Sequence, residues 1–186
     1  MCFYLTSTLP KDADLDQLRP IFNDFNMGFH PIENEYIQSQ LRSQELYFRA
    51  TNAYCDCDTV IGSQINQQAY QNLMNSKKVK TLRKKQWSEA QIEAWILKKL
   101  KTKKPKQTQN LTPLEKDLEL RRWTDFIHII LQNSSVSRVG LIKHWYDGGL
   151  ENEKFIIRET KEVKASDISP EFLLNLREDI LYEFYS

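Results

Sequence analysis

A pair of cysteines separated by a single residue, Cys55 and Cys57, is the local pattern in this chain best suited to chemistry. Two thiolates at this spacing can reach one soft metal ion or one redox partner. A structural zinc site needs four ligands, and the remaining candidates are Cys2 and His30. Together the four residues predict a metal site, with zinc as the first cofactor to consider.

The same residues allow two other interpretations. In a thiol-dependent enzyme, Cys55 or Cys57 would be the nucleophile and His30 its base, which requires a thiol of lowered pKa. The carboxylates of Asp56 and Asp58 oppose this role, because a nearby negative charge disfavours a thiolate. The third interpretation is structural, with half-buried cysteines in a loop and a strand beside an unrelated surface histidine.

The order of the predicted strands gives a reason for the four candidate ligands to meet. Strands are expected over residues 2–9, 29–34 and 45–51, with a helix between the first two. In a split β-α-β unit the third strand runs antiparallel to the other two and ends at the edge where they begin. Cys2 begins the first strand, His30 lies near the start of the second, and the paired cysteines follow the third. The sequence therefore predicts convergence at one sheet edge.

A lysine-rich segment at residues 77–106 is the second candidate for function. It holds twelve basic and two acidic residues, so it carries a formal charge of +10, whereas the rest of the chain carries −9. The candidate binding residues are Lys77, Lys78, Lys80, Arg83, Lys84, Lys85, Lys98, Lys99 and Lys101. Basic side chains interleaved with tryptophans bind phosphates and stack on bases in nucleic-acid-binding proteins. The other partners to consider are an acidic protein, a second copy of the chain, and the acidic remainder of the same chain.

The lysines belong to a predicted helical insertion at residues 64–133. Apolar residues at helical spacing and N-terminal capping patterns indicate helices over residues 64–76, 88–101 and 112–132. A linker rich in lysine, glutamine and threonine, residues 103–110, separates the last two helices. The basic residues are thus expected on an ordered helical segment.

The rest of the sequence predicts one α+β domain over residues 1–186. Two further strands are expected over residues 136–146 and 154–164, joined by a loop with an Asp-Gly-Gly turn. The capped start at Ser169, followed by apolar residues at helical spacing, predicts a C-terminal helix. The expected architecture is a mainly antiparallel sheet in a split β-α-β, ferredoxin-like frame with the helical insertion added.

Composition narrows the function classes. No apolar run approaches the roughly 20 residues that cross a bilayer, which predicts no membrane partner. Three cysteines, an odd number, favour free thiols in a reducing compartment and hence the cytoplasm. The sequence has no Gly-rich phosphate loop and no nucleophile elbow, so it carries no motif that identifies an enzyme of either kind. Other kinds of enzyme are compatible with it. We expect a binding or regulatory protein with an acidic partner, and the alternative is a small metal-binding or thiol-dependent enzyme.

Overall fold

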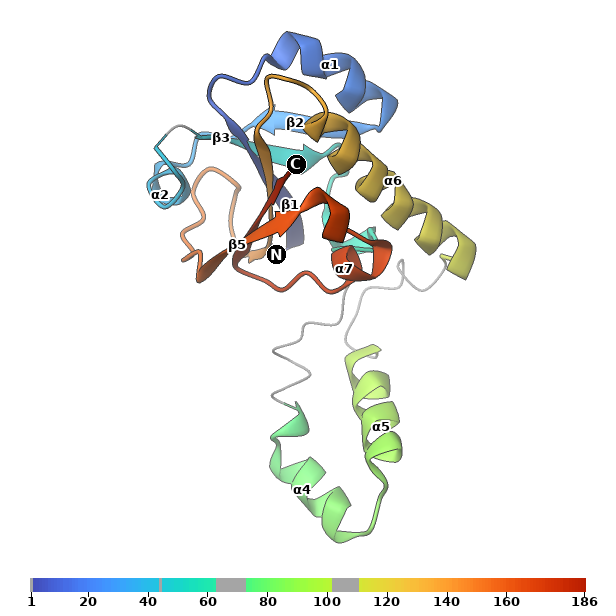
Figure 1. The fold of residues 1–186 in the computed structure, drawn as a ribbon. Helices are drawn as coiled ribbons and strands as arrows, with labels where there is room; N and C mark the ends of the chain where they lie inside the picture. Colours follow the sequence, from blue (N-terminus) through green and yellow to red (C-terminus); the bar gives the residue numbers. More distant parts are fainter. Residues whose placement is uncertain (1, 44, 63–72, 102–110) are drawn as a thin grey trace. The chain divides into compact units, whose positions relative to one another are not determined.

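The sheet of this protein is built from segments at both ends of the sequence (Figure 1). The computed structural model describes residues 2–43, 45–62, 73–101 and 111–186. The chain divides into two compact units, one formed by Met1–Ser63 with Leu111–Ser186 and the other by Gln64–Asn110. We call the first unit the sheet unit and the second the basic hairpin.

Within the described residues, six strands form one sheet in the order β2-β3-β1-β4-β6-β5. Their bounds are β1 (Cys2–Pro10), β2 (Met27–Pro31), β3 (Glu45–Thr51), β4 (Arg138–Tyr146), β5 (Glu159–Lys164) and β6 (Ile180–Tyr185). Neighbouring strands are antiparallel except for β5 and β6, which are parallel. The predicted α+β class is confirmed, and the parallel β5–β6 pair makes the sheet mixed.

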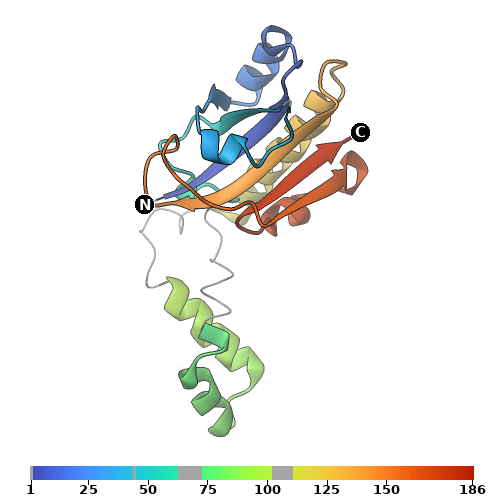
Figure 2. The same cartoon turned by 90° about the vertical axis from the view of Figure 1, so that its left-hand side faces the viewer.

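Apolar layers cover both faces of the sheet. The helices of the sheet unit are α1 (Leu15–Asp24), α2 (Glu35–Gln38), α6 (Pro113–Leu131) and α7 (Pro170–Leu174). Side chains from α1, α6 and α7 form one layer, and α2 with the segment after β4 forms the other. Figure 2 shows α2 in front of the sheet and α6 behind it. Successive side chains of β6 point to opposite faces of the sheet, so Tyr182 and Phe184 pack in the first layer and Leu181 packs in the second.

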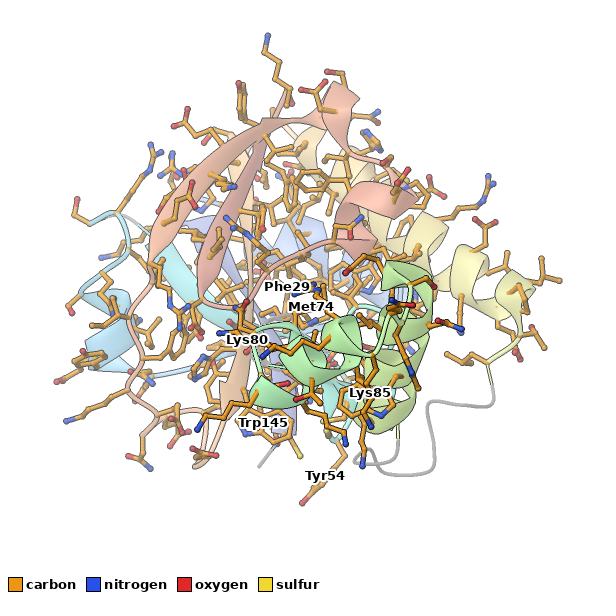
Figure 3. The ribbon with its side chains drawn as sticks, turned by 90° about the horizontal axis from the view of Figure 1, so that it is seen from below. Phe29, Tyr54, Met74, Lys80, Lys85 and Trp145 are labelled. Carbon is orange, nitrogen blue, oxygen red and sulfur yellow. The ribbon has the colours of Figure 1, made fainter. Side chains whose placement is uncertain are left out.

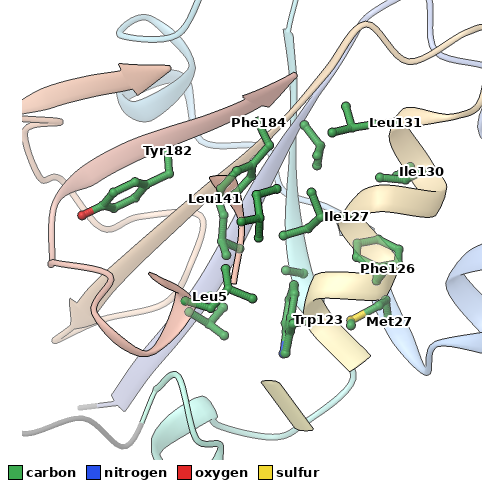
Figure 4. Close-up of a cluster of buried hydrophobic side chains, with 14 of the residues drawn as sticks. Leu5, Met27, Trp123, Phe126, Ile127, Ile130, Leu131, Leu141, Tyr182 and Phe184 are labelled. Carbon is green, nitrogen blue, oxygen red and sulfur yellow. The ribbon is translucent and has the colours of Figure 1, made fainter. Parts of the chain in front are cut away.

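α6 anchors the larger apolar layer. Its side chains Trp123, Phe126, Ile127 and Ile130 are buried against Leu5 and its neighbours in the sheet (Figure 4). The helix begins as its sequence predicts, with a threonine cap, a proline in the first turn and a capping box closed by a glutamate. Burying one such large side chain stabilises the fold by about 1.5–3 kcal/mol. α6 therefore holds the sheet unit together.

The prediction of a long C-terminal helix is wrong beyond Leu174. The Ser169 cap and Pro170 start α7 as expected, but the helix ends at Leu174 and the chain closes in β6. The positions of Ile180 and Phe184 caused the error, because residues four apart share a face in both a helix and a strand. This segment forms a strand because its backbone pairs with β4 on one side and β5 on the other.

The predicted strand at 154–164 forms only over Glu159–Lys164, and it does not pair with β4. β6 lies between them and hydrogen-bonds to both. A short Asp-Gly-Gly turn favours a hairpin, but here it begins a longer connection that crosses one face of the sheet. Competition from a later strand, which sequence patterns do not reveal, overrides the local turn signal.

The basic hairpin contains α4 (Lys77–Lys84) and α5 (Glu89–Lys101). Val79 and Leu82 of α4 form a small buried cluster with Ile92 and Ile96 of α5. Most of the predicted helix at 64–76, and the linker at 103–110, lie outside the described residues. The third helix of the predicted insertion, α6, belongs to the sheet unit.

Candidate metal centre

The sulfur atoms of Cys2, Cys55 and Cys57 lie within 4.8 Å of one another. Cys2 begins β1, and the other two flank the start of the turn η1 (Asp56–Asp58), which follows β3. All three thiols are free and half-buried. Ligands on a tetrahedral zinc ion are about 3.8 Å apart, since each Zn–S bond is about 2.3 Å. The cluster is thus close to ligand spacing and could hold a metal ion.

Asp56 explains why the chain folds back to bring these cysteines to β1. Its buried carboxylate accepts hydrogen bonds from the backbone N–H of Leu5, at 2.8 Å, and from Thr51 Oγ1, at 2.7 Å. Burial raises the pKa of Asp56, while these two hydrogen bonds and the guanidinium of Arg49 act to lower it. Because both oxygens are engaged, Asp56 ties the turn to β1 and β3 and leaves its flanking cysteines beside Cys2.

A second set of hydrogen bonds closes the turn. Thr59 Oγ1 donates to the carbonyl of Asp56 at 2.8 Å and accepts from the N–H of Gly62 at 2.9 Å. A side chain at position 62 would collide with the Asp56 backbone, so the close approach requires glycine. The turn is therefore rigidly specified by residues on both sides of the cysteine pair.

The sulfur atoms receive hydrogen bonds from the backbone. Cys57 Sγ accepts from the N–H of Phe3 at 3.2 Å, and Cys55 Sγ accepts from the N–H of Cys57 at 3.2 Å. Such contacts stabilise negative charge on sulfur, as they do around metal-bound thiolates. Burial nevertheless raises the pKa of Cys55, and the adjoining thiols of Cys57 and Cys2 add to the increase. Without a metal, Cys55 stays a protonated thiol at neutral pH.

His30 does not join the cluster, contrary to the prediction. It lies opposite Arg49 in β2, and its Nε2 is 3.0 Å from Asn52 Oδ1. The sheet edge falls at Met27, which pairs with Thr51, so His30 lies further along the strand, and β3 separates β2 from β1. In the part of the chain that the structure describes, three of the four predicted ligands converge.

The remaining histidines have structural surroundings. His144 stacks on the ring of Phe155, and its Nδ1 is 2.6 Å from a carboxylate oxygen of Asp179. His128 Nε2 lies 2.7 Å from the carbonyl of Ala165. His144 therefore belongs to an aromatic and ionic cluster on the sheet, and His128 lies at the boundary of the core.

The predicted basic residues on α4 and at its C-cap are exposed. Five of them are lysines: Lys77, Lys78, Lys80, Lys84 and Lys85. Figure 3 shows the side chains of Lys80 and Lys85 on the basic hairpin. Arg83 differs, because its Nε and Nη2 donate to the two carboxylate oxygens of Glu89 at 2.8 and 2.9 Å. Lys99 is exposed on α5, and the side chains of Lys98 and Lys101 lie outside the described part of the structure.

Sequence reasoning missed a group of charged residues at the opposite end of the sheet. Glu45 and Glu183 are buried, and each forms an ion pair with an arginine, Arg138 and Arg42 respectively. Each glutamate is far from its arginine in the sequence, so no local spacing of residues predicts these ion pairs. The only signal in the sequence is a charged residue within an otherwise aromatic and aliphatic strand, as at Glu183.

Comparisons with known proteins leave the chain without an assigned relative. No family model, curated protein or solved structure matches it. Among the described residues, no helix has the length and apolar character needed to cross a membrane. Function therefore has to be argued from the geometry of the candidate sites.

Proposed function

We propose that this protein binds a thiophilic metal ion, with zinc as the first candidate, through Cys2, Cys55 and Cys57. The observation that carries the proposal is the approach of three sulfur atoms, from two separate segments, to within 4.8 Å of one another. Soft thiolate ligands select zinc, copper(I) or iron–sulfur clusters over hard cations such as magnesium. The N–H groups that point at Cys55 and Cys57 support the same assignment.

Three thiolates leave one coordination position for another ligand. Catalytic zinc sites have this pattern of three protein ligands, whereas structural sites are closed by four. The raised pKa of Cys55 argues against a role as a free nucleophile, because a nucleophilic cysteine needs a lowered pKa. A metal ion that binds here would displace the thiol protons. A metal-binding protein with one exchangeable position is the function that the geometry supports best.

Purified full-length protein gives the test. We expect about one equivalent of zinc by elemental analysis, and cobalt substitution should give the sulfur-to-metal charge-transfer band of thiolate ligation. Cys2→Ser should lower metal affinity by about a hundredfold or more, whereas His30→Ala should leave it unchanged, because His30 lies outside the cluster. A metal-free protein that takes up neither zinc nor cobalt, or a Cys2→Ser variant with full affinity, would refute the proposal.

A second candidate function is the binding of an acidic partner by the basic hairpin. The lysines of α4 are exposed to solvent, whereas Val79 and Leu82 are buried against α5, so the positive charge of the helix is available to a partner. Trp87 is also partly exposed and offers a ring for stacking. Single-stranded nucleic acid fits both features, and an acidic protein fits the charge alone.

Salt dependence and a comparison of polyanions test the second candidate. A single-stranded DNA oligonucleotide should bind at low salt and weaken steeply as salt increases, because lysine–phosphate contacts release counterions. Polyglutamate that binds as tightly would favour an acidic protein. Protein that binds neither and instead dimerises, as light scattering at two salt concentrations would show, would favour self-association.

Two further parts of the interpretation stay proposals. Free thiols favour a reducing compartment such as the cytoplasm. The order β2-β3-β1-β4, with α1 and α6 in the same apolar layer, supports a split β-α-β frame to which β5 and β6 are added.

A further inference from the structure

A small cavity lies at the end of the sheet remote from the thiol cluster. Cys2 pairs with the last residue of β4, whereas the cavity is built around the first residues of that strand. Its volume is about 200 Å³, and its lining residues are Arg42, Ser137, Arg138, Glu162, Glu183 and Tyr185. The residues come from three strands and two connecting segments, so the fold assembles the cavity from distant parts of the chain.

The carboxylate of Glu183 is incompletely satisfied. Its side chain is only 2% exposed, and Oε2 accepts from Arg42 Nη2 at 2.5 Å. Its other oxygen, Oε1, is buried without a hydrogen-bond partner among the described residues. A buried charged oxygen without a donor is costly. Glu183 lines the cavity, so a molecule bound there could supply the missing donor.

Neighbouring residues repeat the pattern. Glu45, whose side chain is fully buried, accepts from Arg138 Nε at 2.6 Å through Oε1, and its Oε2 has no partner in the described structure. Thr8 Oγ1 is likewise buried and unpaired there. Thr8 pairs with Gly140, and Gly140 pairs with Glu183, so adjacent strands present these acceptors at one end of the sheet.

The cavity also offers hydrogen-bond donors. Within the described residues, Arg138 uses its Nε for Glu45, and Arg42 uses Nη2 for both Glu162 and Glu183. Their other guanidinium N–H groups have no acceptor there, and the side chain of Arg138 is 25% exposed and that of Arg42 50% exposed. Arginine binds carboxylates in a bidentate manner, so these groups suit a ligand carboxylate.

We infer that this cavity binds a small zwitterion, an α-amino acid or a molecule of similar size with one ammonium and one carboxylate group. The ammonium donates to Glu183 Oε1, and the carboxylate accepts from Arg138 and Arg42. An anion alone would leave the buried glutamate oxygen without a donor, and a cation alone would face two arginines. The volume is below the range typical of drug-sized ligands, which suits so small a molecule. The inference does not depend on metal binding at the thiol cluster.

Nuclear magnetic resonance of the ¹⁵N-labelled full-length protein tests the inference. Each common L-amino acid would be added separately at about 10 mM, a concentration that detects millimolar dissociation constants. We expect at least one of them to shift the amide signals of Ser137, Arg138, Glu162 and Glu183. The strongest binder should bind about tenfold or more tightly than its analogues that lack the amino or the carboxyl group.

Two carboxylate-to-amide variants, one inside the cavity and one outside it, separate a binding role from a general effect of lost charge. Glu183→Gln keeps the side-chain shape and should weaken binding about tenfold or more, because a buried charge is lost from the ammonium site. Glu159→Gln is the matched control, because this half-exposed carboxylate on the neighbouring strand lies outside the cavity lining and should change binding by less than about threefold. If Glu183→Gln fails to fold by circular dichroism, Arg138→Lys takes its place. Lysine keeps a positive charge beside Glu45 but loses the guanidinium that binds a carboxylate in a bidentate manner, so binding should still weaken.

Three outcomes would overturn the inference. The first is the absence of amide shifts at the cavity with every amino acid. The second is an analogue without the amino group that binds as tightly as the amino acid, which would make the cavity a simple anion site. The third is an equal loss of affinity for Glu159→Gln and Glu183→Gln.

Discussion

Carboxylates are buried at both ends of the sheet, but their hydrogen bonding differs between the two ends. Near the thiol cluster, Asp56 has a hydrogen-bond donor for each of its oxygens. At the cavity, Glu45 and Glu183 each have one oxygen without a donor in the described structure. A fully satisfied carboxylate organises its surroundings, whereas an incompletely satisfied one leaves a position for a donor from a water, an ion or a ligand. The function that we propose for the first end therefore rests on the sulfur atoms that Asp56 positions, and the one that we propose for the second end rests on the glutamates themselves.

Matched carboxylate-to-amide substitutions test this difference and should give the largest effect. Asp56→Asn removes the charge from two hydrogen bonds that hold the turn, and we expect a loss of about 2–3 kcal/mol in the free energy of unfolding. Glu183→Gln should cost less than about 1 kcal/mol, because its partner Arg42 is half-exposed and retains Glu162. Urea denaturation measures both values, and equal losses would contradict the comparison.

Gly62→Ala sharpens the account of the thiol end. The added methyl group meets the backbone of Asp56, so the turn must shift, and we expect about 1–3 kcal/mol of destabilisation. Metal affinity should fall as well, because the cysteines move with the turn. Gly149→Ala is the control, since a side chain there meets no neighbouring atom and stability should change little. Retention of full stability and metal affinity in Gly62→Ala would show that the turn does not position the sulfurs.

Metal affinity at the thiol end should increase with pH. Because the pKa of Cys55 lies above its usual value, its thiol is protonated at neutral pH, and a metal ion must displace that proton. Each displaced proton makes affinity rise about tenfold per pH unit below the thiol pKa. Zinc titrations against a chelator between about pH 6 and pH 8 measure the slope. Cys55→Ser should reduce it by about one proton, and an affinity independent of pH would contradict thiolate ligation.

The smallest effects are expected on the basic hairpin, whose charges are exposed and not built into a core. Replacing Lys84 and Lys85 by glutamine should reduce the salt dependence of single-stranded DNA binding by about two charges. The control replaces Lys11 and Lys116, which are exposed on the sheet unit and should not change the slope. Arg83 is left in place because it pairs with Glu89. Equal slopes in the two double variants would show that α4 is not the binding surface.

Local features of the fold were predictable from short stretches of sequence. Thr112 and Glu115 exchange the hydrogen bonds of a capping box, and Ser88 and Gln91 do the same at the start of α5. The approach of Cys2 to the paired cysteines also followed from strand order, because β3 runs antiparallel to β1. In each case the residues in contact are either a few positions apart in the sequence or brought together by a single reversal of the chain.

Other features depend on partners that only the folded chain supplies. The six residues of β6 have a spacing compatible with helix or strand, and pairing with β4 and β5 selects the strand. His30 misses the thiol cluster because β3 lies between its strand and β1, and its own strand begins at Met27. A one-dimensional pattern places residues along an element, but the offset between neighbouring strands places them against one another.

The sequence by itself determined the helix caps, the basic character of the hairpin and the presence of cysteines that a single chain reversal could bring together. Only the tertiary structure decided that three ligands meet without His30, and that Arg42 and Arg138 meet buried glutamates across separations of 141 and 93 residues. The physical reason is the range of the interactions. Caps and charge patterns act within a turn or two of helix, whereas both candidate sites depend on strand order and register, which the whole sheet sets together.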